Sequence, residues 1–102
     1  MFTVRLSDQA NLDLREIQGY FAEYSFDLAQ KHILRLANTI ERIGQEPFTW
    51  PFFFLTGAPY RSKLFFVGRT SFWIIYEIVE QDSVINILRI WNSRQNPEDF
   101  EF

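Results

Sequence analysis

Apolar residues recur at two different spacings in the first quarter of the chain. Phe2, Val4 and Leu6 alternate with polar residues, which predicts a short strand with one buried face. From residue 8 to 23 the spacing changes to three or four, which predicts a helix, with Ala10, Leu14, Ile17 and Phe21 on its apolar side. Ser7 precedes this helix and is a favourable N-cap, because its hydroxyl can accept a hydrogen bond from an unpaired amide of the first turn.

A second helix is predicted over residues 25–43. Its stripe is formed by Ala29, Ile33, Leu36, Ile40 and Ile43. Ser25 or Asp27 is the expected cap, and Gly44 followed by Pro47 ends the helix. The break between the helices is short, so we expect them to form an antiparallel hairpin.

The second half of the chain has strand-like patterns. Three runs, 60–67, 71–79 and 84–92, are rich in β-branched and aromatic residues and are joined by segments short enough for hairpins. The whole chain, 1–102, is therefore predicted to be one α+β domain of order β-α-α-β-β-β. A four-stranded, mostly antiparallel sheet would pack on the N-terminal helical hairpin, with the aromatic loop 45–59 beside the sheet.

The central strands are apolar on both faces. Phe72, Ile74, Tyr76 and Ile78 alternate with Trp73, Ile75 and Val79, and in the last strand Val84, Leu88 and Ile90 are expected opposite Ile85, Ile87 and Trp91. A sheet with one face in water should alternate apolar with polar residues. Since the hairpin can cover one face only, the other face needs either the loop 45–58 or another protein.

Composition supports a protein partner and argues against several other classes. Aromatic residues make up 19% of the chain, with 12 Phe, which is more than so small a core requires. The net charge is −3, a poor footprint for nucleic-acid binding, although residues 61–94 are weakly basic at +2. No signal-peptide pattern is seen and the apolar runs are too short to cross a bilayer, so we expect a cytoplasmic protein without membrane contact.

Familiar catalytic patterns are absent from the sequence. There is no Gly-rich phosphate loop, nucleophile elbow, cysteine or metal-ligand spacing, so no cofactor or metal is expected. His32 lies off the apolar stripe and is expected to be exposed. The exception is a set of four cations and one indole: Arg61, Lys63, Arg89, Trp91 and Arg94. If the last three strands form a meander, these side chains could gather at one end of the sheet. Otherwise the cations are charges at the rim of the sheet, paired with Glu77 and the acidic tail.

Four segments resemble the RelE/ParE superfamily of bacterial toxins, and together they cover nearly the whole chain. They are "VRLSDQANLDLREIQGYF", "RLANTIERIGQEP", "YRSKLFFVGRTSFWIIYEI" and "INILRIWNSRQNPEDF". The resemblance implies a toxin of a type II toxin–antitoxin system, held inactive by a small cognate antitoxin. Ribonuclease members cut messenger RNA on the ribosome without a metal, which requires a base, an acid and cations around the phosphate. ParE-type members are described as poisons of DNA gyrase.

Position by position, the ribonuclease pattern is incomplete. Where ribonuclease members have a cation in the first meander strand, this chain has Phe65 and Phe66. The basic residue after the last strand is kept as Arg94. Trp91 stands where a His is frequent and Phe100 where a Tyr is frequent, so two proton-handling groups are missing. Tyr76 and Glu46 are the residues that could replace them.

The resemblance therefore favours a ParE-like toxin that acts on gyrase by protein contact. We expect target docking by Arg61, Arg89, Trp91, Arg94 and Phe100, and antitoxin binding by Trp50, Phe52, Phe53, Phe54 and Trp73. The alternative is a RelE-like, metal-independent endoribonuclease that acts on ribosome-bound messenger RNA and uses Arg61, Lys63, Arg89 and Arg94. A second alternative is a small protein-binding domain outside any toxin system, or an inactive toxin relic.

Overall fold

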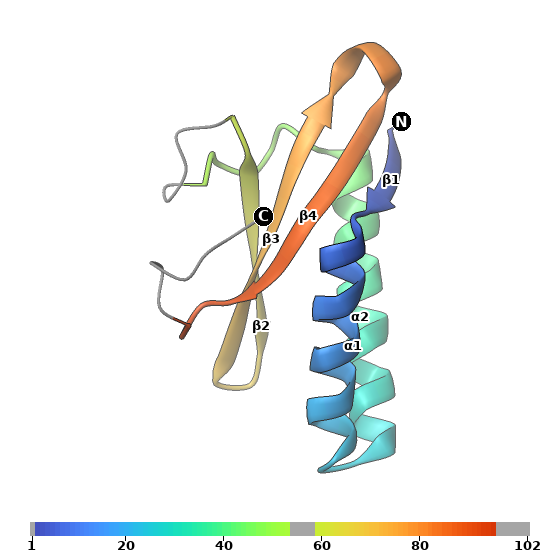
Figure 1. Cartoon of the computed structure of the whole chain (residues 1–102), viewed down its shortest axis with the longest axis vertical. Coiled ribbons are helices and arrows are strands. Elements are labelled where there is room, and N and C mark those ends of the chain that lie inside the picture. The colour runs from blue at the N-terminus through green and yellow to red at the C-terminus, as the bar shows by residue number, and fades with distance from the viewer. Residues whose placement is uncertain (1, 54–58, 96–102) are drawn as a thin grey trace.

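The chain forms two helices and a four-stranded sheet in the predicted order (Figure 1). A computed structural model describes residues 2–53 and 59–95. The elements are β1 (Thr3–Leu6), α1 (Asp8–Ala22), α2 (Phe26–Gln45), β2 (Arg61–Val67), β3 (Thr70–Val79) and β4 (Val84–Asn92), with a 3-10 turn at Glu80–Asp82. The predicted α+β class is confirmed.

Serine hydroxyls cap the N-termini of both helices. The Ser7 hydroxyl accepts a hydrogen bond from the Ala10 amide at 3.0 Å, and the Ser25 hydroxyl accepts one from the Leu28 amide at 3.2 Å. Ser25, and not Asp27, is therefore the cap of α2. Each hydroxyl satisfies one of the amides that a helix leaves unpaired in its first turn.

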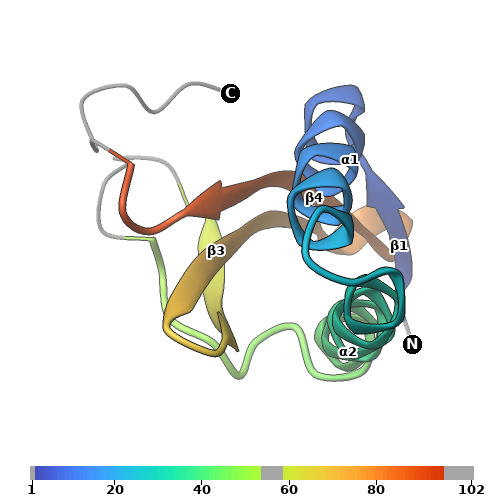
Figure 2. The same cartoon turned by 90° about the horizontal axis from the view of Figure 1, so that it is seen from below.

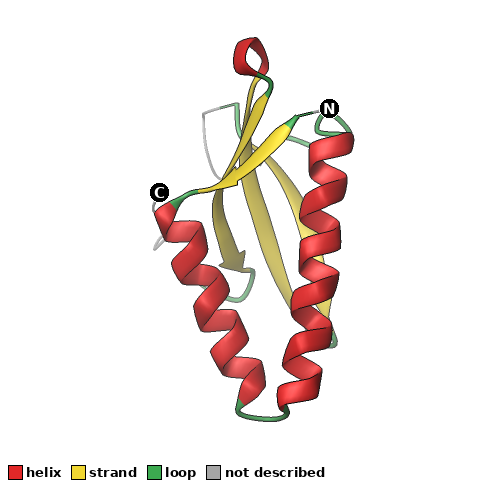
Figure 3. Cartoon of the chain, turned by 90° about the vertical axis from the view of Figure 1, so that its right-hand side faces the viewer, coloured by secondary structure: helices red, strands yellow, loops and turns green. Residues whose placement is uncertain are grey.

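The sheet has the strand order β1-β4-β3-β2, so β1 and β2 are its edges. β1 pairs with β4 in parallel, and the other two pairs are antiparallel. The helices lie side by side against one face of the sheet, with α1 next to β4 (Figures 2 and 3). Pairing between β1 and β4 ends at Leu6 and Ile87, so within residues 2–53 and 59–95 the rest of β4 has no strand neighbour on that side.

A β-bulge in β4 changes which residues face the helices. Ile75 is opposite Arg89 whereas Tyr76 is opposite Ile87, so Leu88 is an extra residue between two paired positions. One extra residue reverses the alternation of a strand beyond it. As a result Ile85, Ile87 and Ile90 all join the core beneath the helices. The prediction that Ile90 lies on the face opposite Ile85 and Ile87 is therefore wrong.

The aromatic loop covers part of the second face of the sheet. Phe53 is only 1% exposed and packs with Ile75 and Trp91, and Tyr60 and Trp73 pack against this cluster. Two backbone hydrogen bonds fix the loop to β2 and the residue before it, from the Phe53 amide to the Tyr60 carbonyl at 2.7 Å and from the Ser62 amide to the Pro51 carbonyl at 2.9 Å. The sequence left open whether this face is covered by the loop or by another protein. In the described residues the loop covers part of it.

His32 is not the exposed residue that its position off the stripe predicted. It is half-buried, with its ring centroid 4.9 Å from that of Phe21. Its Nδ1 atom is buried without a hydrogen-bond partner among the described residues. Burial, assisted by Arg35 and Lys31, lowers the pKa of His32. This favours the neutral ring as part of the packing between the helices.

Two glycines in the helices are predicted to respond in opposite ways to alanine. A Cβ atom at Gly44 would lie 2.8 Å from Cγ2 of Val4, whereas nothing lies within 4 Å of one at Gly19. Gly44→Ala should lower the free energy of unfolding by about 1–3 kcal/mol because of overpacking. Gly19→Ala should raise it by about 0.5–1 kcal/mol because alanine is the better helix former. Urea unfolding of both variants measures this, and a change of the same sign in both would contradict the close packing of α2 on β1.

Candidate functional site

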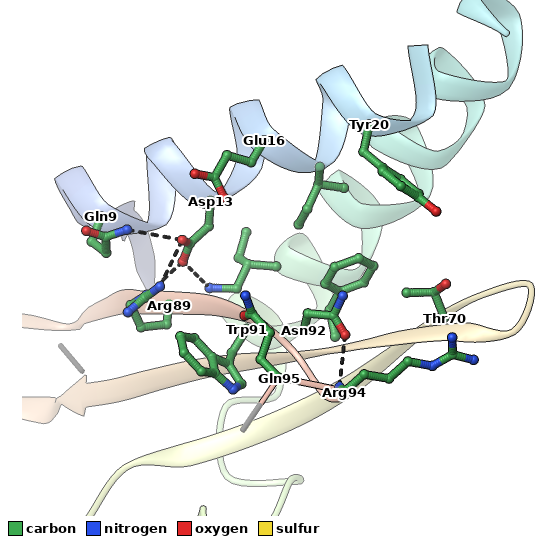
Figure 4. A pocket seen from close by; sticks show the side chains of 13 residues that line it. Gln9, Asp13, Glu16, Tyr20, Thr70, Arg89, Trp91, Asn92, Arg94 and Gln95 are labelled. Atoms are coloured by element: carbon green, nitrogen blue, oxygen red, sulfur yellow. Dashed lines mark hydrogen bonds and ion pairs between the residues drawn. The ribbon is translucent and has the colours of Figure 1, made fainter. Parts of the chain in front are cut away.

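A cleft of about 430 Å³ lies between α1 and the adjoining ends of β3 and β4 (Figure 4). It lies where β1 has ended and α1 has become the neighbour of β4. The cleft is lined by Gln9, Asp13, Glu16, Ile17, Tyr20, Thr70, Phe72, Arg89, Ile90, Trp91, Asn92, Arg94 and Gln95. Three residues of the predicted docking set, Arg89, Trp91 and Arg94, line this cleft.

Asp13 is the buried centre of this cleft. Its carboxylate accepts hydrogen bonds from Nε of Arg89 at 2.8 Å, from Nη2 of Arg89 at 3.1 Å and from the backbone amide of Ile90 at 2.9 Å. The side-chain amide of Gln9 adds a fourth at 3.2 Å. The side chains of Arg89 and Asp13 are 11% and 7% exposed, so the pair is shielded from water. Such a carboxylate has little capacity left for another ligand.

The sequence reading missed Asp13 although its position contained a signal. Asp13 is three residues after Ala10 and four before Ile17, so it lies on the buried side of α1. A carboxylate on an apolar stripe must find a cation or amide partner, because burying an unpaired charge is unfavourable. That partner is on β4, 76 positions away, and the spacing of residues gives no information about so distant a contact.

Arg89, Trp91 and Arg94 are brought together at this cleft, as the sequence suggested. The Arg89 guanidinium carbon lies 4.8 Å from the centroid of the Trp91 ring, which is 7% exposed. Arg94 is exposed, and its guanidinium donates to the Arg69 carbonyl at 3.0 Å. Arg94 is therefore the cation of this group that a partner can reach most easily. Phe100 lies outside the described residues.

Arg61 and Lys63 do not join this group. The Arg61 guanidinium donates to the Trp50 carbonyl at 2.7 Å and lies 4.3 Å from the centroid of the Phe52 ring. Lys63 donates to the Leu64 carbonyl at 3.0 Å and lies 5.8 Å from the centroid of the Trp50 ring. Neither lines the cleft, so the described cations of the predicted set divide between two places and do not gather at one end of the sheet.

Tyr76 and Glu46, considered as replacements for missing proton-handling groups, are not at the cleft either. Tyr76 is fully buried and its hydroxyl donates to the Pro47 carbonyl at 2.6 Å. Burial raises the pKa of Tyr76 to about 12, although the nearby Arg61 acts in the opposite direction. Its hydrogen bond holds the start of the aromatic loop against the sheet. Glu46 is exposed at the C-cap of α2.

The residues predicted to bind an antitoxin differ widely in accessibility. Phe52 is 59% exposed, Trp50 and Trp73 are half-buried, and Phe53 is buried against Trp73 with ring centroids 5.7 Å apart. A partner would reach Phe53 only after displacing the loop. Phe54 lies outside the described residues.

The cleft contains no recognisable metal site. No group of three or more His, Cys, Asp or Glu residues that could hold a metal ion occurs in residues 2–53 and 59–95. Within the same ranges, no helix has both the length and the apolar character needed to cross a membrane.

Comparison with known proteins gives one family. The family model described as the ParE toxin of the type II toxin–antitoxin system, parDE, matches residues 4–97. Among solved structures, a metal-bound toxin from Helicobacter pylori is similar, with 19% sequence identity, a TM-score of 0.48 and coverage of 98% of this chain and 100% of that one. No curated protein sequence matches this chain.

The Asp13–Arg89 pair is predicted to be a main source of stability at the cleft. Asp13→Ala leaves the Arg89 guanidinium and the Ile90 amide buried without their acceptor. We expect the free energy of unfolding to fall by about 3 kcal/mol or more. Glu16→Ala, at an exposed position of the same helix, is the matched control and should change it by less than about 0.5 kcal/mol. Equal effects of the two variants in urea unfolding would show that the pair is not structural.

Tyr76 is predicted to make stability depend on alkaline pH. Its pKa is raised from 10.0 in the unfolded chain to about 12 in the folded one, so the folded state binds the hydroxyl proton more tightly. The corresponding stability is complete below pH 10 and is lost as the pH rises toward 12. Tyr76→Phe removes both the titration and the bond to Pro47, so it should be less stable at neutral pH and lose less stability between pH 10 and 12. Denaturant unfolding across this range tests it, and parallel pH profiles for the two proteins would refute it.

Proposed function

The chain belongs to the ParE toxin family of type II toxin–antitoxin systems, and we propose that it acts by protein contact with DNA gyrase until a cognate antitoxin neutralises it. The supporting observation is the state of Arg89. A ribonuclease needs free cations to hold the scissile phosphate and groups that exchange protons with the reacting oxygens. At this cleft the Arg89 guanidinium is already bound by the buried carboxylate of Asp13.

The charge at the cleft also disfavours RNA. Two carboxylates, Asp13 and Glu16, line it together with two cations, Arg89 and Arg94. A phosphate would have to compete with Asp13 for Arg89 and would be repelled by both acids. Trp91, at the position where ribonuclease relatives frequently have a histidine, has an indole that does not exchange protons at neutral pH.

A protein target suits the same residues better. Arg and Trp are favoured in the few positions that supply most of the affinity of an interface. Arg94 and Tyr20 are exposed at the rim of the cleft, and Trp91 lies beneath with Arg89 on its ring. We propose that Arg94 makes the first contact with the target while the Asp13–Arg89 pair and Trp91 keep the surface rigid.

The antitoxin is proposed to cover the aromatic surface at the start of β2. Phe48 and Phe52 are both exposed, and the Arg61 guanidinium lies near both rings, 5.6 Å and 4.3 Å from their centroids. The Trp50 carbonyl accepts from the same Arg61 guanidinium, and Trp73 packs against Phe53, which would join this surface only if the loop moved. Since the proposed target and antitoxin both act inside the bacterial cell, we place the toxin in the cytoplasm.

The proposal predicts that Arg94 is needed for gyrase inhibition. Arg94→Ala should raise the toxin concentration that half-inhibits supercoiling by purified gyrase by roughly fivefold or more, as expected for loss of an interface contact worth over ~1 kcal/mol. Arg5→Ala removes another exposed cation, on β1, and serves as the control, with inhibition unchanged. Thermal unfolding should be the same for both variants, since neither side chain is buried.

The ribonuclease alternative is tested on the same proteins. Translating ribosomes with a defined messenger are incubated with wild-type toxin, and the RNA is examined for cuts at the ribosomal A site. We expect intact messenger. Cleavage that is lost in Arg94→Ala, together with no effect on gyrase, would establish the RelE-like activity instead.

A further inference from the structure

A second concave place lies between α2 and β2, and its charge is one-sided. This groove of about 340 Å³ is lined by Arg35, Asn38, Thr39, Arg42, Lys63, Leu64, Phe65 and Phe66. Three of these residues are cations and none is acidic, although the chain as a whole has a net charge of −3. The groove is thus a local positive site on an acidic protein, which attracts negative groups.

The three cations are held by carbonyl groups and rings, not by carboxylates. Lys63 donates to the Leu64 carbonyl at 3.0 Å, and Arg35 donates to the Phe66 carbonyl at 3.1 Å. Arg42 lies 5.9 Å from the centroid of the Trp50 ring. Within the described ranges none of the three forms an ion pair. Each is therefore available for the stronger bond that a carboxylate would offer.

The groove also contains an open sheet edge. β2 is an edge strand of the sheet, and among the described residues only its beginning is covered, where the Ser62 amide donates to the Pro51 carbonyl. Further along, the carbonyls of Leu64 and Phe66 accept hydrogen bonds from Lys63 and Arg35, which line the groove. These two carbonyls therefore point into the groove and away from β3. In a strand the N–H of a residue points to the same side as its C=O. Both residues thus present the two backbone groups that an added strand would use.

The two faces of β2 determine which side chains an added strand would need on each of its own faces. Phe65 joins the core beneath the helices, and Lys63 lies over Trp50 on the same side. Leu64 and Phe66 project from the other face, where Phe66 is 58% exposed. Side chains of a strand beside β2 would alternate in the same way. Those on the helix side would meet Arg35, Arg42 and Lys63, and those on the other side would meet Leu64 and Phe66.

We infer that the α2–β2 groove binds an extended protein segment in which acidic and apolar residues alternate. The segment adds to the edge of β2 at Leu64 and Phe66 and takes over the backbone bonds now made by Lys63 and Arg35. Its carboxylates pair with the three cations. The inference concerns the groove alone and does not depend on gyrase being the target.

A synthetic peptide provides the test. A fluorescent peptide of alternating glutamate and valine is titrated with the full-length chain at low salt, and its anisotropy is measured. Arg42→Glu and Lys63→Glu should each weaken binding by roughly tenfold or more, because each replaces a charge-assisted bond by repulsion. Arg15→Glu, an exposed charge reversal on α1 outside the groove, should leave the dissociation constant within about twofold.

Phe66→Pro separates strand addition from simple charge attraction. Proline removes the outward N–H while leaving every cation in place, and an edge strand tolerates proline where its N–H faces outward. Phe66→Ala keeps the N–H and loses only the ring. We expect Phe66→Pro to bind the peptide roughly tenfold more weakly than Phe66→Ala. In the wild-type chain, hydrogen exchange at the Leu64 and Phe66 amides should slow when peptide binds, a readout that remains if the proline variant does not fold.

Three results would overturn the inference. If the peptide does not bind, the cations only shield the edge of β2 from pairing. If a peptide of alternating lysine and valine binds equally well, the groove does not select acids. If a single-stranded RNA oligonucleotide binds more tightly than the peptide, and Phe66→Pro binds it as well as Phe66→Ala does, the groove recognises phosphate and not a strand.

Discussion

The unpaired edge of β4 beyond Ile87 is the constraint on which the rest of the structure depends. β1 is too short to cover this edge, and buried backbone groups must find hydrogen-bond partners. The first turns of α1 supply them. The Ser7 amide donates to the Ile87 carbonyl, the Ser7 hydroxyl donates to the Leu88 carbonyl, and the Asp13 carboxylate accepts from the Ile90 amide. One helix thus completes the edge that a strand would otherwise occupy, and the bulge at Leu88 lies within the stretch that it covers.

This solution decides what the cleft can do. The carboxylate that satisfies Ile90 also binds Arg89 through two nitrogens, so the central cation of the predicted site is part of the fold. Arg94 and the rim remain for an external partner. A site of this kind suits recognition of a protein surface, where rigid, desolvated groups support a few exposed contacts. The edge of β2, at the opposite side of the sheet from β1, is by contrast not paired with another strand of the described chain along Leu64 and Phe66, and we infer that a partner strand fits there.

Local patterns in the sequence were enough to predict the elements, and long-range contacts account for what was missed. Ser7 and Ser25 are local signals, and they correctly marked where the helices begin. Gly44 did not mark the end of α2, because the helix continues through Gly44 to Gln45 and Glu46 is its C-cap. No distinctive residue marks the bulge at Leu88, which reverses the alternation of side chains along β4. A strictly alternating pattern therefore placed Ile90 on the wrong face. Asp13 and His32 depend on what lies opposite them in the folded chain, Arg89 in one case and Phe21 in the other. The packing of Phe53 on the second face of the sheet is also a long-range contact, so the sequence could not decide between the loop and another protein as its cover.

The most direct test of this account is the coupling between Asp13 and Arg89 in a double-mutant cycle. Asp13→Asn and Arg89→Gln remove the charges while keeping similar shapes, and the asparagine oxygen can still accept from the Ile90 amide. Denaturant unfolding of the wild type, both single variants and the double variant gives the interaction energy. We predict a coupling of about 2 kcal/mol or more, as for a shielded pair that makes several hydrogen bonds. Effects that add to within about 0.5 kcal/mol would contradict it and remove the main argument against Arg89 as a phosphate-binding residue.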